Sequence, residues 1–152
     1  MKKNITPNLW FDGNAQDAVE YYLSVFPESK VISTAYYPTE GLADFQKGLA
    51  GKVLTIEFEL SGNRFVAMNA GPDFTFNESI SFSIECEDQA EIDYYWDKLS
   101  RVPEAEQCGW CKDRFGLSWQ IVPKGMDVLM QHSNAFANLM LMKKIVIADF
   151  SK

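Results

Sequence analysis

Residues 5–27 read ITPNLWFDGNAQDAVEYYLSVFP, and their arrangement of apolar side chains returns in residues 78–100, which read ESISFSIECEDQAEIDYYWDKLS. The shift between the two stretches is a constant 73 positions, so that Glu20-Tyr21-Tyr22 corresponds to Asp93-Tyr94-Tyr95. Because the matches cross a strand-like and a helix-like pattern, they indicate an internal duplication. The same shift also pairs Leu9 with Phe82, Phe11 with Ile84, Val19 with Ile92, Leu23 with Trp96 and Phe26 with Leu99.

Each copy begins with an alternating segment that leads into a helix. In the first copy, the side chains of residues 5–11 alternate between two faces, as in a strand. Asn14 and Asp17 then form a pair typical of a helix N-terminal cap, and Pro27 ends the helix. In the second copy, residues 79–84 alternate before a helix whose opening pair is Asp88 and Glu91, and whose apolar stripe contains Ile92, Tyr95, Trp96 and Leu99. The apolar stripe of the first helix contains Ala18, Tyr21, Tyr22, Val25 and Phe26.

The remaining strands follow from alternation and from turn residues. A tight turn at residues 61–63 (Ser-Gly-Asn) predicts a hairpin between two of them. The second copy is the shorter one and is expected to lack part of a strand pairing. The strands are predicted at residues 31–37, 53–60 and 64–70 in the first copy, and at 109–112 and 117–122 in the second.

The predicted fold class is α+β, with paired β-α-β-β-β modules and a C-terminal helical extension. We expect one domain over residues 1–152, with module 1 at about 4–72, module 2 at about 78–123 and the extension at 124–152. The extension contains a Met- and Leu-rich helix around residues 135–142. Residues 145–147 (Ile-Val-Ile) fit either a strand or a continued helix, and both alternatives stay open.

Strand alternation sorts the side chains onto two faces of the sheet. Leu54, Ile56 and Phe58 alternate with Thr55, Glu57 and Glu59, so one face is apolar and the other polar. The apolar faces must pack on the two helices. The polar face, which also carries Trp10, is expected to line a cleft. The alternative is that this face simply meets water, as in many antiparallel sheets.

Composition limits the classes of partner. The chain has 152 residues, 47% of them hydrophobic, and a net charge of −7, which disfavours nucleic acid and anionic membranes as partners. No apolar run approaches the roughly 20 residues that span a bilayer. The start of the chain lacks the apolar region of a signal peptide, and three cysteines do not make a disulfide framework. A cytoplasmic location is therefore expected.

Several motifs resemble the PhnB-like family, often described as 3-demethylubiquinone-9 3-methyltransferase-like. The resemblance implies membership of the vicinal oxygen chelate superfamily, with glyoxalase I, extradiol dioxygenases and bleomycin-resistance proteins. It also implies paired β-α-β-β-β modules and a homodimer. The motifs are residues 5–13 (ITPNLWFDG) with Ala18, Tyr21-Tyr22 and Phe26-Pro27, residues 69–74 (NAGPDF) and 76–78 (FNE), 108–110 (CGW), 112–123 (KDRFGLSWQIVP) and 142–145 (MKKI).

The superfamily resemblance also implies positions for a divalent metal, on the first and last strands of each module. By similarity these positions fall near Thr6, Met68 or Asn69, Ser79 and Gln120. Hydroxyl and amide groups are poorer ligands for Zn²⁺, Fe or Ni than imidazole and carboxylate groups are. Only Gln120 keeps a suitable ligand type, and the single histidine, His132, lies in the tail. We therefore predict no metal and no other cofactor, although a divalent metal stays an alternative.

The favoured function is the binding of a small molecule in a sheet-lined cleft without a metal, as in bleomycin-resistance-type members. Aromatic faces and hydrogen-bonding side chains would hold the ligand, and Glu57 would serve a cationic group or act as a general base. Phe74 and Phe76 would add apolar faces. The predicted cleft residues are Thr6, Trp10, Asn69, Ser79, Trp110 and Gln120.

Three other functions are weighed against this one. A glyoxalase- or dioxygenase-type metal enzyme would use the same cleft. The methyltransferase description would, in the common type, require a glycine-rich turn between a strand and a helix, and no G-x-G-x-x-G stretch exists. Cys108 and Cys111 form a C-x-x-C string, but a redox motif needs a helix N-terminus, and this stretch is predicted to be extended. These residues do not decide whether a reaction is catalysed.

Overall fold

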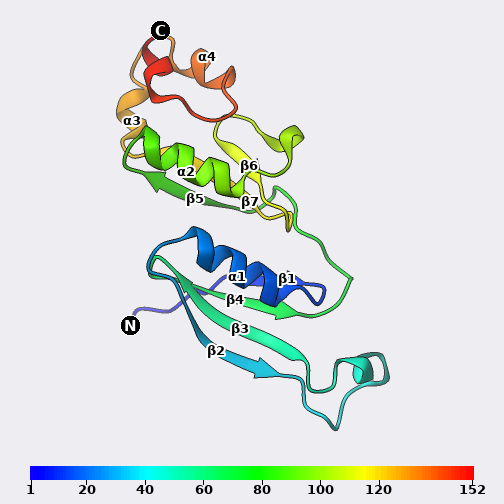
Figure 1. The fold of residues 1–152 in the computed structure, drawn as a ribbon. Coiled ribbons are helices and arrows are strands. Elements are labelled where there is room, and N and C mark those ends of the chain that lie inside the picture. The colour runs from blue at the N-terminus through cyan, green and yellow to red at the C-terminus, as the bar shows by residue number, and fades with distance from the viewer. The chain divides into compact units, whose positions relative to one another are not determined.

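The computed structural model describes residues 1–152, which separate into two compact units, Met1–Thr75 and Phe76–Lys152. The first unit runs β1 (Asn8–Phe11), α1 (Ala15–Val25), β2 (Lys30–Tyr36), a 3₁₀ helix η1 (Asp44–Leu49), β3 (Val53–Leu60) and β4 (Asn63–Asn69). Its sheet has the order β1-β4-β3-β2, with β1 parallel to β4 and the other pairs antiparallel. This is the predicted β-α-β-β-β module (Figure 1).

The second unit repeats this plan with one strand fewer. It runs β5 (Ser81–Cys86), α2 (Gln89–Leu99), a 3₁₀ helix η2 (Pro103–Ala105), β6 (Trp110–Lys112) and β7 (Ser118–Pro123). The sheet order is β5-β7-β6, with β5 parallel to β7 and β6 antiparallel to it. The short turn η2 stands where the first unit has β2, so the expected loss of a strand pairing is confirmed. The predicted α+β class is also confirmed.

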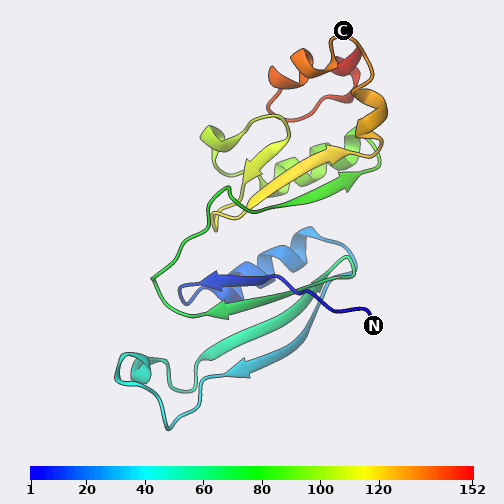
Figure 2. The same ribbon diagram turned by 180° about the vertical axis from the view of Figure 1, so that it is seen from behind.

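In each unit one helix covers one face of the sheet and leaves the other face open within that unit (Figures 1 and 2). The predicted alternation of β3 holds, because Ile56, Phe58 and Leu60 are buried while Glu57 and Glu59 are half-buried. Full burial of one such side chain contributes about 1.5–3 kcal/mol. The stripe on α1 is confirmed for all its members except Tyr21, which is half-buried.

The predicted hairpin between β3 and β4 is present, but its turn has two residues, one fewer than the predicted turn at residues 61–63. Leu60 pairs with Asn63, and the two residues between them have positive φ, 46° at Ser61 and 82° at Gly62. This is the backbone of a type I′ turn, whose twist matches that of the flanking strands. The register of the hairpin, and with it the face on which each β3 and β4 side chain lies, follows from this turn.

The two helices open differently, although the sequence predicts the same cap for both. At α2 the Asp88 carboxylate accepts a hydrogen bond from the Glu91 backbone N–H at 2.9 Å, as expected. At α1 the Asn14 side chain makes no capping bond, so the predicted Asn14–Asp17 pair is wrong. The Ala15 N–H donates instead to Asn69 Oδ1, a residue at the end of β4.

The C-terminal segment forms α3 (Met126–Leu129), α4 (Ala135–Met140) and a 3₁₀ helix η3 (Ile147–Ser151). Residues 145 and 146 belong to neither a strand nor a helix, so neither alternative for this stretch is correct there. The longest helices of the chain, α1 and α2, have 11 residues each, and none is long and apolar enough to cross a membrane.

Backbone bonds join this segment to the turn before β6. The N–H groups of Cys108 and Gly109 donate to the carbonyl oxygens of Met142 and Lys143 at 2.9 and 2.8 Å. A side chain at Gly109 would meet Ile145 Cδ1 at 2.8 Å and the Ile121 carbonyl oxygen at 2.9 Å, and φ at this glycine is +87°. Only glycine therefore lets residue 145 pack here.

We expect Gly109→Ala to lower the free energy of unfolding by about 3 kcal/mol or more, because left-handed strain and overpacking each cost roughly 1–3 kcal/mol. Gly125→Ala is the matched control, since Gly125 also has positive φ (+74°) but open space around its Cβ position. It should lose only about 1–2 kcal/mol. Urea unfolding of both variants measures the difference, and equal losses would contradict the close packing of Ile145.

Candidate functional site

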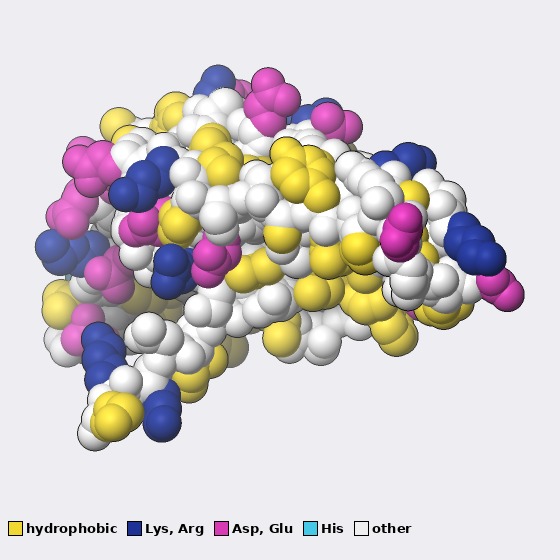
Figure 3. All heavy atoms as spheres, turned by 90° about the horizontal axis from the view of Figure 1, so that it is seen from below, with side chains coloured by type: hydrophobic (Ala, Val, Ile, Leu, Met, Phe, Trp, Pro, Cys, Tyr) yellow, Lys and Arg dark blue, Asp and Glu magenta, His cyan; other side chains and the backbone are white.

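The open face of the first unit presents two rows of side chains that run across the sheet. Trp10, Met68, Thr55 and Ala35 occupy paired positions in one row. Asn8, Val66, Glu57 and Ser33 occupy the next row, two residues along each strand. In the view from below, hydrophobic and uncharged side chains fill the middle of the visible face, and charged side chains gather toward its ends (Figure 3).

Trp10 is held on this face by its indole N–H, which donates to the Gly71 carbonyl oxygen at 2.8 Å. The ring of Phe74 meets the Trp10 ring at a centroid distance of 4.8 Å and an interplanar angle of 78°. This edge-to-face geometry is favourable for aromatic pairs. Phe74 is 64% exposed. Together the two rings form an oriented aromatic surface at the β1 edge of the open face.

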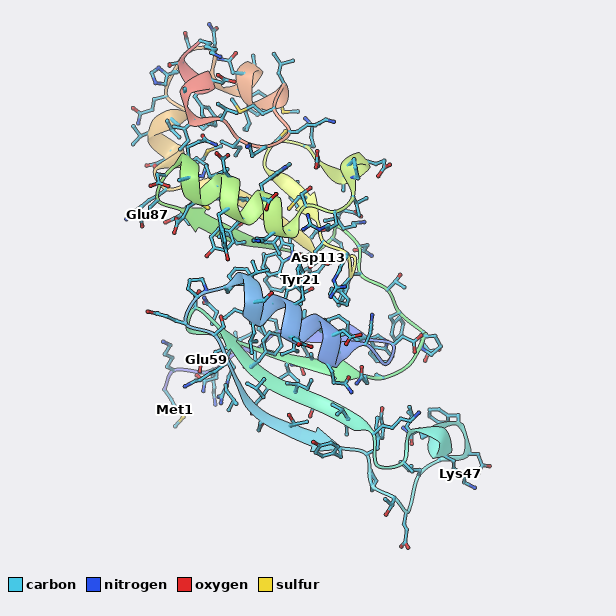
Figure 4. The ribbon with its side chains drawn as sticks, viewed as in Figure 1. Met1, Tyr21, Lys47, Glu59, Glu87 and Asp113 are labelled. Atoms are coloured by element: carbon cyan, nitrogen blue, oxygen red, sulfur yellow. The ribbon has the colours of Figure 1, made fainter.

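Glu57 is the carboxylate in the neighbouring row. Its Oε2 accepts a hydrogen bond from Ser33 Oγ at 3.1 Å, and its Oε1 lies 3.6 Å from Arg64 Nε. The side chains of Glu57 and Arg64 are 36% and 48% exposed, so this ion pair lies in solvent, where such pairs contribute about 0–1 kcal/mol. Glu59, two residues along and labelled in Figure 4, pairs with Lys30 at 3.6 Å.

The open face of the second unit has equivalent positions with different side chains. Ser83, Gln120 and Trp110 form one row, and Ser81, Ser118 and Lys112 form the next. Gln120 Nε2 donates to Ser81 Oγ at 2.8 Å, and Lys112 forms an ion pair with Glu78. This pairing with Lys112 holds the pKa of the exposed Glu78 carboxyl below its usual value.

Strand register makes the correspondence between the two units explicit. Trp10 pairs with Met68 in the first unit, and Ser83 pairs with Gln120 at the equivalent place in the second. In the next row Glu57 pairs with Val66, and the equivalent pair in the second unit is Lys112 with Ser118. The duplication has therefore left a carboxylate in one unit and an ammonium group in the other at the same place on the sheet. The two faces therefore present side chains of opposite charge at this position.

The structure places the six predicted cleft residues unequally. Trp10, Trp110 and Gln120 lie on the open face of their own unit. Thr6 precedes β1, where the parallel ladder still reaches the Pro7 carbonyl oxygen through the Val66 N–H. Ser79 lies in a turn before β5, and both its N–H and its hydroxyl donate to Asn77 Oδ1.

Asn69 lies on the helix-covered face and is only 5% exposed. Its Oδ1 accepts from the Ala15 N–H at 2.9 Å, and its Nδ2 donates to Gln16 Oε1 at 2.9 Å and to the Val53 carbonyl oxygen at 3.1 Å. The side chain has no free hydrogen-bonding capacity directed at a ligand, so we leave Asn69 out of the candidate site. Strand parity separates it from Met68, which lies on the open face.

The residues at the expected metal positions do not fit a divalent metal. They offer the hydroxyls of Thr6 and Ser79, the thioether of Met68 or the occupied amide of Asn69, and the amide of Gln120. Zn²⁺ and the other borderline metals favour imidazole, thiolate and carboxylate. No three His, Cys, Asp or Glu side chains come together to hold an ion. His132 is exposed in the segment between α3 and α4.

The C-x-x-C string does not place two reactive thiols together. Cys108 has φ of 50° in the turn before β6 and accepts a hydrogen bond from Gln107 Nε2 at 3.2 Å. Cys111 is buried on the helix-facing side of β6, and burial, with smaller contributions from Asp113 and Glu106, raises its pKa to about 12. Burial likewise raises the pKa of Cys86 to about 12.

Asp113 is a buried carboxylate whose importance the sequence did not reveal. It lies in the connection between β6 and β7, is 0% exposed, and accepts from the N–H groups of Phe115 and Leu117 and from Trp119 Nε1 at 2.8–3.2 Å (Figure 4). The sequence placed residues 113–116 only as the connection between two predicted strands. It gave no sign that the indole of Trp119 would return to the same carboxylate.

Comparison with known proteins relates this fold to others. The sequence family described as 3-demethylubiquinone-9 3-methyltransferase matches residues 3–122. A putative 3-demethylubiquinone-9 3-methyltransferase, PhnB protein, from Bacillus cereus is structurally similar, with a TM-score of 0.64 and 29% sequence identity. That comparison covers 80% of this chain and 100% of the Bacillus chain. No curated protein matches the sequence.

Two further structures share the fold at lower identity. A protein from Pseudomonas aeruginosa has a TM-score of 0.56 at 19% identity, covering 81% of this chain and 98% of that one. The fosfomycin resistance protein FosX from Listeria monocytogenes has a TM-score of 0.53 at 12% identity, covering 87% and 99%. At these identities the likeness concerns the fold alone.

We expect Asn69→Ala to reduce the free energy of unfolding by about 3 kcal/mol, because it leaves the Ala15 N–H and the Val53 carbonyl without a partner in a buried setting. Asn8→Ala, on the open face of the same sheet, should change it by about 0.5 kcal/mol or less. Chemical denaturation compares the two variants. A small effect at Asn69 would contradict its structural role and restore it as a candidate ligand residue.

We expect one cysteine of the folded protein to react quickly with Ellman's reagent at pH 8, and three after denaturation. With pKa values of about 12, the thiols of Cys86 and Cys111 stay protonated at that pH, and the thiolate is the reactive form. Cys108→Ser should remove the fast reaction. Rapid labelling of two thiols, or a Cys108–Cys111 disulfide formed by mild oxidant, would support a redox function instead.

Proposed function

The chain belongs to the 3-demethylubiquinone-9 3-methyltransferase family and has the PhnB-like fold of the vicinal oxygen chelate superfamily. From this premise we propose that it binds a small molecule on the open face of a sheet, without a divalent metal. The ligand has an aromatic or other planar group and a cationic group. The observation that carries the proposal is the placement of Trp10 and Glu57 on one face of the first unit.

The aromatic end of the proposed site rests on the fixed orientation of Trp10. The indole N–H is already bonded to Gly71, and Phe74 supports one side of the ring, so little side-chain freedom remains to be lost on binding. A planar group stacked on such a pair gains about 0.5–1.5 kcal/mol beyond its buried area. A cation near the rings would gain a similar amount.

The charged end is Glu57, two strands and one row away from Trp10. With strands about 4.8 Å apart and about 6.7 Å between rows, the two Cα atoms are separated by roughly 12 Å. Both side chains project from the same face. A ligand with a ring and a basic nitrogen separated by a short aliphatic spacer matches this distance. The exposed Arg64 is a weak competitor for the carboxylate.

In the second unit, Trp110 and Gln120 offer an aromatic ring and an amide in one row. We include both in the proposed ligand-binding surface of the chain, since a ring and a hydrogen-bonding group lie side by side there as well. Lys112 in the next row suits an anionic or polar group rather than a cation. The open face of each unit therefore has its own chemical preference.

Methyl transfer from a nucleotide-type donor, the activity in the family description, has little support in these residues. Such donors are usually bound by a glycine-rich turn between a parallel strand and a helix. The turn between β1 and α1 has a single glycine, Gly13, and the first helical N–H is already bonded to Asn69. A glyoxalase- or dioxygenase-type metal reaction is likewise disfavoured, because the donor set does not suit the metal.

The test uses 4-phenylbutylamine, which is cationic at neutral pH, with neutral 4-phenylbutanol as the matched compound. We expect the amine to bind more tightly, and Glu57→Gln to weaken amine binding about fivefold while leaving the alcohol unchanged, since one exposed charge pair is worth about 1 kcal/mol. Trp10→Ala should weaken both compounds. Binding is measured by chemical-shift titration of labelled protein.

Glu59→Gln is the control for charge, because Glu59 lies on the same strand and face but in the next row. It should change amine affinity by less than about twofold. If both Glu→Gln changes weaken amine binding equally, the amine is attracted by the overall negative charge of the protein and not by Glu57 in particular. Shifts that avoid β1, β3 and β4 would contradict the site, and stoichiometric metal in purified protein would favour the enzyme alternative.

A further inference from the structure

A surface depression of about 370 Å³, open to solvent and called the cavity below, lies within the C-terminal segment, between α4 and η3. Its apolar walls are formed by Leu141, Met142 and Val146, and three lysines, Lys143, Lys144 and Lys152, also line it. This volume falls within the roughly 300–1,000 Å³ of small-molecule sites, at the small end. All of these residues belong to the second unit.

Lysine side chains outnumber acidic side chains in the lining of this cavity. The lining contains three lysines and one acidic residue, Asp149, although the chain as a whole carries a net charge of −7. Lys144 pairs with Asp93 at 2.6 Å, and Lys152 pairs with Asp149. Lys143 is exposed and has no ion pair. One ammonium group beside the apolar walls is therefore available to an anion.

The backbone that carries these residues is held in place by the turn before β6 and by α2. The Met142 and Lys143 carbonyl oxygens accept from the turn at residues 108–109. Gln89 of α2 donates to the Ile145 carbonyl oxygen at 3.0 Å and accepts from the Ile147 N–H at 2.9 Å. Ile145 is fully buried. The walls are thus formed before any ligand arrives, which lowers the entropic cost of binding.

The Asn138 side chain, which also lines the cavity, joins α4 to the end of the chain. Its Nδ2 donates to the Phe150 carbonyl oxygen at 3.3 Å and to the Lys152 carbonyl oxygen at 3.0 Å. Leu141, another lining residue, is 86% exposed. An apolar surface and a free ammonium group therefore lie together in this lining.

We propose that this cavity binds a small organic anion with an apolar body, of the arenecarboxylate class. The apolar body would cover Leu141, Met142 and Val146, and the carboxylate would pair with Lys143. None of these residues lies within residues 3–122, the part of the chain that matches the family. The site is also separate from the open sheet faces, with which it shares no residue.

The test is titration of the full-length protein with 1-naphthoate, followed by amide chemical shifts, with neutral 1-naphthalenemethanol as the matched compound. We expect saturable shifts in residues 138–152 with naphthoate and weaker binding of the alcohol. Lys143→Met keeps the aliphatic stem and removes the charge, so it should weaken naphthoate binding about fivefold. Lys143→Arg should restore the affinity.

Two further variants make the result specific. Val146→Trp should fill the cavity and abolish binding, and its unfolding transition shows whether the protein remains folded. Lys98→Met removes an exposed lysine of α2 that does not line the cavity, and it should leave binding unchanged. Equal binding of acid and alcohol, an equal effect of Lys98→Met and Lys143→Met, or no binding at millimolar concentration would overturn the proposal. Trp10→Ala leaves this titration unchanged if the two sites are independent.

Discussion

The first unit depends on the requirement that a buried polar side chain find partners for all its hydrogen-bonding groups. Asn69 is almost fully buried, and its amide joins the start of α1 to the start of β3. Its backbone carbonyl oxygen accepts the hydroxyl of Tyr37, just past β2, at 2.6 Å. One residue thus ties the helix to three strands, and the open face can stay rigid because the covered face is fixed this way.

In the second unit the buried polar side chain that needs hydrogen-bond partners is a carboxylate. Asp113 is completely buried and satisfied by two backbone N–H groups and one indole, which fixes the turn between β6 and β7. A buried carboxylate without such partners would cost several kcal/mol. The unit has only three strands, and the C-terminal segment is bound next to the turn before β6. Gly109 makes that close approach possible.

Duplication explains why the covered and open faces have diverged to different degrees. Packing against a helix keeps the covered positions apolar in both units, as at Leu9 and Phe82. Within each unit no helix covers the open positions, where Trp10 corresponds to Ser83 and Glu57 to Lys112. Substitutions at exposed positions of these faces should therefore change stability less than substitutions at the covered positions. Lys143 in the C-terminal segment is likewise exposed.

The sequence by itself determined the elements whose causes are local. These elements depend on neighbours along the chain, and the structure has each of them. They are the strands and helices predicted from apolar side chains with periods of two and 3.6 residues, the repeat at 73 positions, the turn at residues 61–62 and the Asp88 cap. Strand parity also separated the covered face from the face that carries Trp10 and Glu57. Only the tertiary structure decided what depends on distant partners. Asn69 caps a helix 54 positions away, so local propensity favoured Asn14 instead. A hydrogen bond between residues far apart in sequence has no local signal, because either partner alone looks like an ordinary polar residue.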